Sequence, residues 1–315
     1  MLNFKKKLPE RVEIEIPSIR DDMDGFYKLW AELFNKNWAN TSYYYIVLTF
    51  SACNFAGVNM TAILGAFVHF VQLKLFGSTI RIETRTMNKQ VYQKLVNMGL
   101  LEALDKLDGH GFIPKTDEII RYKEFPISTK EEEILFYLRH DWLGKNRLNF
   151  SDDVESAVLS SLWEIYANAF EHSETPRVQS CGSYDKKNNK LTLLVGDLGK
   201  GIVNSVVQYL NKTLSPREAL EWALIKGNST YTANLKESGE AQPRGLGLHL
   251  LTQLVDINEG RMEIYTGSIF YVRNLKKSFY QTMPIPVSGC WVRLTLNCIR
   301  DVKYYFSDEN IPEYF

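Results

Sequence analysis

The first hundred residues alternate between two hydrophobic periodicities, and this alternation constrains the fold more than any other sequence feature. The β-branched and aromatic run Tyr43–Phe50 and the alternating run Thr79–Thr84 are typical of strands. The longer apolar segments Asn59–Phe76 and Met87–Leu104 are typical of helices. A strand–helix–strand–helix order predicts parallel strand pairing. We therefore expect a small α/β sandwich at the N-terminus.

Two shorter segments precede this unit. Alternating Val12, Ile14 and Ile16 predict a strand, and the apolar spacing in Asp24–Phe34 predicts a helix.

Length and charge bound the organisation of the chain. Its 315 residues favour two domains. The turn-rich segment Asp108–Pro114 and a linker strand at Arg121–Pro126 place the boundary, so we expect domains at 1–125 and 126–315. There are 37 basic and 37 acidic residues, and this net charge of zero argues against direct nucleic-acid binding.

The sequence predicts a cytoplasmic protein with no membrane segment. The most apolar run, 61–76, is interrupted by His69, Gln72 and Lys74 and is too short to span a bilayer. No apolar stretch follows the basic start of the chain. The four cysteines form no CxxC pair, which argues against a zinc site or a disulfide framework.

The second half of the sequence predicts mixed α/β structure. Asp152 is the expected N-cap of a long helix, with Glu155 completing a capping box, and Ser215 is expected to cap another helix in the same way. The remaining expected elements are a helix at Thr129–Leu143, a hairpin of Arg177–Tyr184 with Leu191–Val195, a short helix ending at Leu210, a mobile loop at Asn228–Gln242, a helix at Gly245–Asn258, and closing strands at Met262–Thr266 and Trp291–Leu296.

Three segments of this half carry candidate chemistry. In the first, Glu164 and Asn168 lie four residues apart on one helix, so their side chains share a face. A carboxylate and an amide at this spacing can act as a general base and a Mg²⁺ ligand beside a phosphate. A merely polar helix surface is the alternative interpretation.

The second segment is DLGKGI, which follows an apolar strand. Asp197 at the strand end can accept a hydrogen bond from an exocyclic amine such as that of adenine. Gly199 and Gly201, just before Ile202, allow the backbone to approach a flat ligand closely. An ordinary glycine turn is the alternative.

The third segment is RGLGLHLL, in which Gly245 and Gly247 open a helix. Unpaired N–H groups and the positive end of the helix dipole favour anions at such a start, and Arg244 would add charge. A glycine-rich helix start without a ligand is the alternative.

The order WEIYANAFEHS, GDLGKGI and GLGLHLL resembles the N box and the two glycine boxes of the GHKL ATPase superfamily, over residues 150–298. The resemblance implies a Bergerat-type α/β sandwich, with a mixed sheet and helices on one face, that binds ATP with Mg²⁺. It implies that Asn168 ligates Mg²⁺, Glu164 is the catalytic base and Asp197 binds the adenine amine. Gly199, Gly201 and Ile202 would line the base pocket, while Arg244, Gly245, Leu246, Gly247 and Leu248 would surround the phosphates.

Residues 40–105 resemble the STAS fold of anti-sigma-factor antagonists. The matching segments are IVLTFSACNF, GSTIRIE and VYQKLVNMGLLEAL. Those proteins carry a phosphorylated serine at a helix start, where this chain has Ala56-Gly57-Val58-Asn59-Met60. The departure argues against a phosphoacceptor and favours a STAS-like domain that docks protein partners or self-associates, which leaves a homodimer open.

Three functions remain after this comparison: an ATPase switch, a serine/threonine protein kinase of the partner-switching type, and a non-catalytic nucleotide-dependent scaffold. A histidine kinase fits less well, because His140 lies only 28 residues before Asn168. That distance leaves no room for the helical hairpin that carries a phosphoacceptor histidine.

Overall fold

The computed structural model describes residues 8–39, 42–104, 118–144, 147–172, 176–228, 247–299 and 302–305. The chain divides into two compact units, Met1–Lys123 and Glu124–Phe315, which we call the N-terminal and C-terminal units. No helix within the described residues is long and apolar enough to cross a membrane.

The N-terminal unit is built on a parallel three-stranded sheet. Its strands β1 (Glu10–Glu15), β2 (Tyr44–Thr49) and β3 (Thr79–Ile82) pair in that order. Helices α1 (Met23–Phe34) and α2 (Val58–Lys74) alternate with them along the chain and pack together. The predicted parallel pairing is confirmed.

The prediction of a single helix at Met87–Leu104 is wrong, because this segment forms two helices. After the short 3₁₀ turn η1 (Thr84–Thr86), α3 (Lys89–Asn97) ends at Met98 and α4 (Leu100–Ala103) follows. Gly99 between them has φ +79°, which is left-handed backbone that breaks an α-helix. A side chain at this position would also lie 2.9 Å from Nε of Arg121, which would have to shift.

The N-terminus of α2 is capped by a side chain from another segment. The Asp21 carboxylate accepts hydrogen bonds from the backbone N–H groups of Val58 at 3.0 Å and Asn59 at 2.8 Å. The Asn59 amide in turn donates to the carbonyls of Arg20 and Asp22, which fixes the segment that carries Asp21. This arrangement satisfies N–H groups that a helix start leaves unpaired.

A five-stranded sheet forms the centre of the C-terminal unit, in the order β4-β6-β7-β9-β8. Strand β4 (Ile119–Pro126) contains the segment expected as a linker strand and is an edge strand of this sheet. The predicted hairpin is confirmed, because β6 (Arg177–Asp185) and β7 (Lys190–Gly196) pair antiparallel. A separate two-stranded sheet joins β5 (Asn149–Phe150) and β10 (Lys303–Tyr304).

The closing strands are much longer than the sequence indicated. Strands β8 (Arg261–Asn274) and β9 (Lys277–Asn297) form one long antiparallel hairpin that includes both predicted segments. Register shifts interrupt the pairing on either side of Gly267. Such irregularities hide the two-residue periodicity on which a strand prediction depends.

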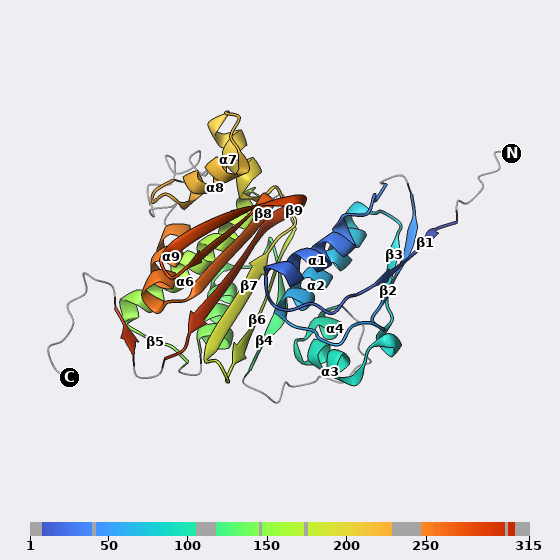
Figure 1. Ribbon diagram of the computed structural model, residues 1–315, viewed down its shortest axis with the longest axis horizontal. Coiled ribbons are helices and arrows are strands. Elements are labelled where there is room, and N and C mark those ends of the chain that lie inside the picture. Colours follow the sequence, from blue (N-terminus) through green and yellow to red (C-terminus); the bar gives the residue numbers. More distant parts are fainter. Residues whose placement is uncertain are drawn as a thin grey trace. The chain divides into compact units, whose positions relative to one another are not determined.

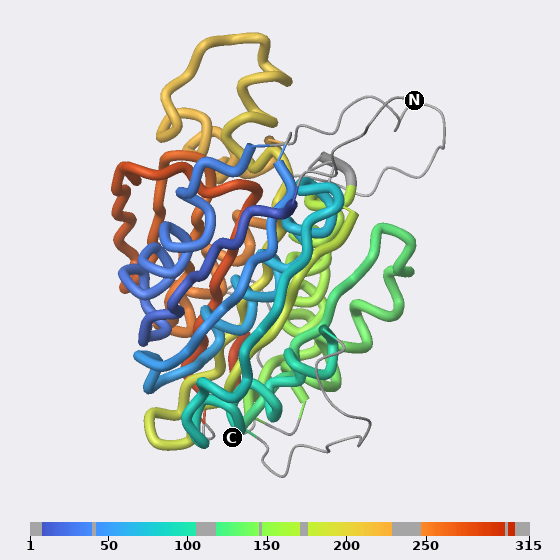
Figure 2. The backbone as a smooth tube through the Cα atoms, turned by 90° about the vertical axis from the view of Figure 1, so that its right-hand side faces the viewer, coloured from blue at the N-terminus to red at the C-terminus, as the bar shows by residue number. Residues whose placement is uncertain are grey.

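Helices α6 (Asp152–His172), α7 (Gly201–Leu210), α8 (Pro216–Leu224) and α9 (Gly247–Asn258) complete the C-terminal unit. The predicted capping box at Ser215 is confirmed. The predicted N-cap of α6 is wrong by one residue, because the Ser151 hydroxyl, and not Asp152, accepts the N–H of Val154 at 3.2 Å. Figures 1 and 2 both show α7 and α8 at one end of the sheet.

The helix expected at Thr129–Leu143 changes character part-way. It begins as α5 (Glu131–Phe136) and continues as the π-helix η2 (Tyr137–Leu143), whose wider turns helical periodicity alone does not indicate. Other predictions fall on segments outside the described residues: the linker at Asp108–Pro114, most of the loop at Asn228–Gln242, and Arg244, Gly245 and Leu246.

Candidate functional site

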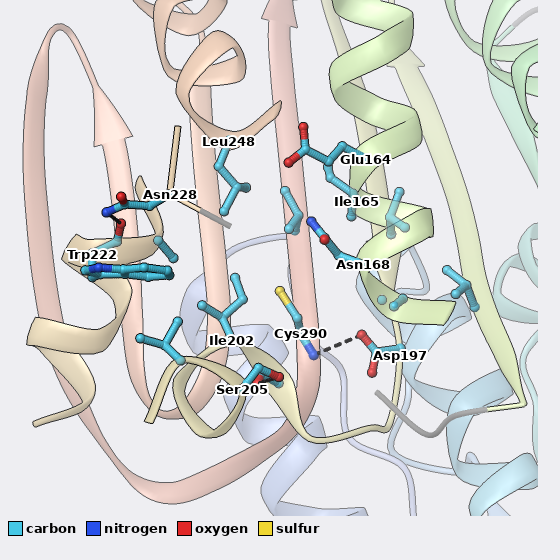
Figure 3. A pocket seen from close by; sticks show the side chains of 18 residues that line it. Glu164, Ile165, Asn168, Asp197, Ile202, Ser205, Trp222, Asn228, Leu248 and Cys290 are labelled. Carbon is cyan, nitrogen blue, oxygen red and sulfur yellow. Dashed lines mark hydrogen bonds between the residues drawn. The ribbon is translucent and has the colours of Figure 1, made fainter. Parts of the chain in front are cut away.

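A cavity of about 840 Å³, including its open mouth, lies between the helices and the sheet of the C-terminal unit (Figure 3). Helices α6, α7, α8 and α9 each contribute to its lining. Val178, Val195 and Val292 from β6, β7 and β9 also line it. These four helices therefore cover the same face of the sheet, and the cavity lies between them.

Glu164 and Asn168 line the cavity from α6, as their spacing predicts. Figure 3 shows both side chains directed from the helix toward the cavity. The Glu164 Oε2 atom accepts a hydrogen bond of 2.6 Å from the backbone N–H of Gly247, at the start of α9. A side chain at Gly247 would lie 2.7 Å from that oxygen, so the glycine permits the close approach.

Asp197 lies at the end of β7 and is only 2 % exposed. Its Oδ1 accepts the N–H of Gly199 at 2.6 Å, and its Oδ2 accepts the N–H of Cys290 at 3.2 Å. Two backbone donors hold the carboxylate in one orientation beside the cavity. Because a carboxylate has about four acceptor positions, it can also accept a hydrogen bond from a ligand.

Sequence reasoning missed the residues that support this part of the cavity. The Thr266 hydroxyl accepts the N–H of Ile202 at 3.1 Å and donates to the carbonyl of Gly289 at 2.9 Å. Gly289 has φ +74°, and a side chain there would collide with the backbone of Asp197. The only sequence signal was a lone glycine before a strand, in VSGCW, and its partners lie tens of residues away.

Cys290 adds a thiol to the cavity wall beside Asp197. Burial, and secondarily the nearby charge of Asp197, raise the pKa of the Cys290 thiol well above its usual range. The thiol therefore remains neutral at physiological pH.

The wall that α7 and α8 provide is mostly apolar. Ile202, Val206 and Trp222 line it, and the ring of Trp222 lies 5.8 Å from that of Tyr209. The Asn228 amide, which also faces the cavity, donates to the carbonyl of Trp222 at 2.9 Å. An apolar wall opposite a few fixed polar groups is typical of a small-molecule site.

Most of the described candidate residues meet at this cavity. Glu164, Asn168, Asp197, Gly201, Ile202 and Leu248 line it. Gly199 and Gly247 contact it indirectly, through their hydrogen bonds to Asp197 and Glu164. No lysine or arginine is among the described residues in its lining.

Within the described residues, no group of three or more His, Cys, Asp or Glu side chains could hold a metal ion. Asn168 nevertheless offers an amide oxygen, which is a suitable ligand for Mg²⁺. A Mg²⁺ ion commonly takes only one or two protein ligands and completes its shell with water and substrate phosphates. The donor set of the cavity therefore fits an ion that arrives with a phosphate ligand.

No protein-family model matches the chain, and no curated protein matches it either. Among solved structures, the chain is similar to the histidine kinase domain of the blue-light activated histidine kinase from Erythrobacter litoralis EL346. The two are 13% identical, and the match covers 76% of this chain and 85% of that one with a TM-score of 0.26. A score this low supports no conclusion about function. The function is therefore inferred from the cavity itself.

Proposed function

We propose that the C-terminal unit binds ATP with Mg²⁺ and transfers the γ-phosphoryl group, to water or to a protein hydroxyl, as a regulatory switch. One observation carries this proposal: a single cavity is lined by residues of all three segments that resemble the GHKL motifs. Glu164 and Asn168 come from α6, Asp197 and Gly201 from the DLGKGI segment, and Leu248 from the start of α9. These segments are far apart in the sequence.

Different groups of the cavity would bind the adenine, the Mg²⁺ ion and the phosphates. The buried Asp197 carboxylate would accept a hydrogen bond from the exocyclic amine of adenine, and the apolar wall would cover the faces of the base. Asn168 would ligate Mg²⁺, which neutralises phosphate charge when bound. The first N–H groups of α9 would bind phosphate oxygens.

Glu164 is the best candidate for the base. It would accept the proton of the attacking water or hydroxyl as that oxygen bonds to the γ-phosphorus. The bond between this phosphorus and the bridging oxygen breaks, and its electron pair leaves with ADP. The same residues serve hydrolysis and protein phosphorylation, so the acceptor decides between them.

One labelling experiment tests the proposal and identifies the acceptor. The purified chain is incubated with γ-labelled ATP and Mg²⁺, alone and with cell lysate. We expect label in inorganic phosphate for an ATPase, or on a protein for a kinase. Absence of both products, together with no nucleotide binding by calorimetry, would contradict the proposal, whereas binding without turnover would favour the non-catalytic scaffold.

Asn168→Ala tests the assigned metal ligand. We expect loss of most Mg-ATP affinity by calorimetry, because the other amide of the described lining, that of Asn228, comes from another segment and is bound to the carbonyl of Trp222. Asn204→Ala is a matched control, since Asn204 is an exposed amide on α7 that donates to the carbonyl of Lys200. Equal affinity of the Asn168 variant and the wild type would rule out the assignment.

We propose that the N-terminal unit is a docking domain for a protein partner or a second copy of the chain. At the start of α2 the carboxylate of Asp21 already occupies the N–H groups. The nearest hydroxyl in that helix, on Thr61, is fully buried and donates to the carbonyl of Gly57. These contacts support docking over phosphorylation at this helix start. Sedimentation of the full chain, with and without ATP, tests self-association.

A further inference from the structure

The hydrogen bond between Glu164 and Gly247 occupies part of the proposed phosphate site. The first N–H groups of a helix have no partner within the helix, and they attract anions. In α9 a carboxylate is already bound there, with 2.6 Å between Glu164 Oε2 and the Gly247 nitrogen. The protein thus supplies its own anion at the end of a helix that faces the cavity.

The contact involves more than one oxygen atom. A side chain on Gly247 would lie 2.8 Å from the Cβ of Glu164 and 2.9 Å from its Cδ, as well as 2.7 Å from Oε2. The whole Glu164 side chain therefore lies against the first turn of α9. A ligand phosphate that binds the same N–H group must move it.

We propose that this contact is an autoinhibitory latch: Glu164 competes with the nucleotide phosphates for the N-terminus of α9, and phosphate binding releases it. This inference rests on the proposed function and adds a regulation of the same site. In the closed state the carboxylate is engaged with backbone N–H. In the open state, which only a phosphate-bearing ligand stabilises, it can act as a base.

The latch predicts an effect opposite to that of an ordinary binding residue. Removing Glu164 removes both a competing hydrogen bond and a negative charge beside the phosphates. A hydrogen bond to a charged group contributes about 1.5 kcal/mol or more. Removing this competing bond should therefore raise the affinity for a phosphate ligand about tenfold. ATP and ADP should bind Glu164→Ala about tenfold more tightly than wild type, while adenosine, which has no phosphate, should bind both equally.

Calorimetry on the purified full chain tests this with ATP, ADP and adenosine in the presence of Mg²⁺. Glu164→Gln is the second variant, because it retains the size of the side chain and an amide acceptor but not the charge, and it should give an intermediate gain. Glu155→Ala is the matched control on the same helix: this exposed glutamate pairs with Arg139 and does not line the cavity. The control should bind all three ligands as wild type does.

The possible outcomes distinguish failure of the latch from failure of the proposed nucleotide binding. Tighter ATP and ADP binding with unchanged adenosine binding supports the latch. If wild type binds ATP but Glu164→Ala binds it equally or more weakly, the latch is overturned and the proposed function remains. If neither protein binds any of the three ligands, both are overturned.

Discussion

Two helices of this protein, one in each unit, begin with a carboxylate from another segment bound to their N–H groups. At α2, Asp21 accepts two backbone hydrogen bonds, at 3.0 Å and 2.8 Å. At α9, Glu164 accepts the N–H of Gly247, at 2.6 Å. The local chemistry is the same, since an anion satisfies the positive end of a helix in both cases.

The difference lies in what holds each carboxylate. Asp21 has a short side chain on a segment that Asn59 ties down on both sides. Glu164 has a longer, rotatable side chain, and it lines the open cavity of the C-terminal unit. An occupied helix start is therefore a structural cap where its partner is fixed, and an exchangeable site where its partner can move into free space.

The largest expected difference between the two carboxylates is in catalysis. Glu164→Gln should lower ATP turnover by about 10²- to 10⁴-fold, because a neutral amide cannot accept the proton of the attacking oxygen. Asp21→Asn should leave turnover unchanged. Phosphate release by both variants, measured under saturating Mg-ATP, checks this, and full activity of Glu164→Gln would show that another group is the base.

Stability should respond in the reverse order. Asp21→Ala leaves two backbone N–H groups without their cap and should lower the free energy of unfolding by about 2 kcal/mol, the upper range for loss of a helix cap. Glu164→Ala should cost about 0.5 kcal/mol or less, because water from the cavity can replace its hydrogen bond to Gly247. Urea unfolding followed by tryptophan fluorescence measures both, and equal losses would remove the distinction between cap and latch.

The smallest effect concerns the glycines beneath the two carboxylates. A side chain at Gly57 would collide with the Asp21 carboxylate, and one at Gly247 would lie 2.8 Å from the Cβ of Glu164, which the backbone of α6 holds in place. Gly57→Ala should therefore cost about 1 kcal/mol, a part of the value of the cap that it displaces, and Gly247→Ala should cost at least as much. Thermal unfolding of the two variants under identical conditions provides the measurement, and a Gly247→Ala variant as stable as wild type would show that α9 can move away from Glu164.

Local sequence signals predicted the elements whose causes are local. The capping box at Ser215 needs only a Ser and a Glu three residues apart, and the hairpin before Asp197 needs alternation and a polar turn. The Glu164–Asn168 spacing likewise fixed a shared helix face, and both side chains line the cavity. In each case the residues that carry the signal lie within one short stretch of sequence.

The features that the sequence did not predict depend on contacts between residues far apart in the chain. Gly99 breaks the predicted helix next to Arg121, which belongs to a later strand, and Thr266 supports Ile202 across 64 residues of sequence. The role of Gly289 depends on its approach to Asp197, which no local pattern contains. The Glu164–Gly247 hydrogen bond is of the same kind, because its two residues lie 83 positions apart.

The long β8–β9 hairpin has a consequence for the order in which the chain folds. Its ends meet at a turn of Leu275 and Lys276, both with positive φ (48° and 60°). Asn and Gly are the residues that form such a turn readily, so here the turn itself disfavours pairing. We expect the hairpin to form late and from its far end, where Tyr265 and Trp291 pair within the buried sheet, with the turn closing last.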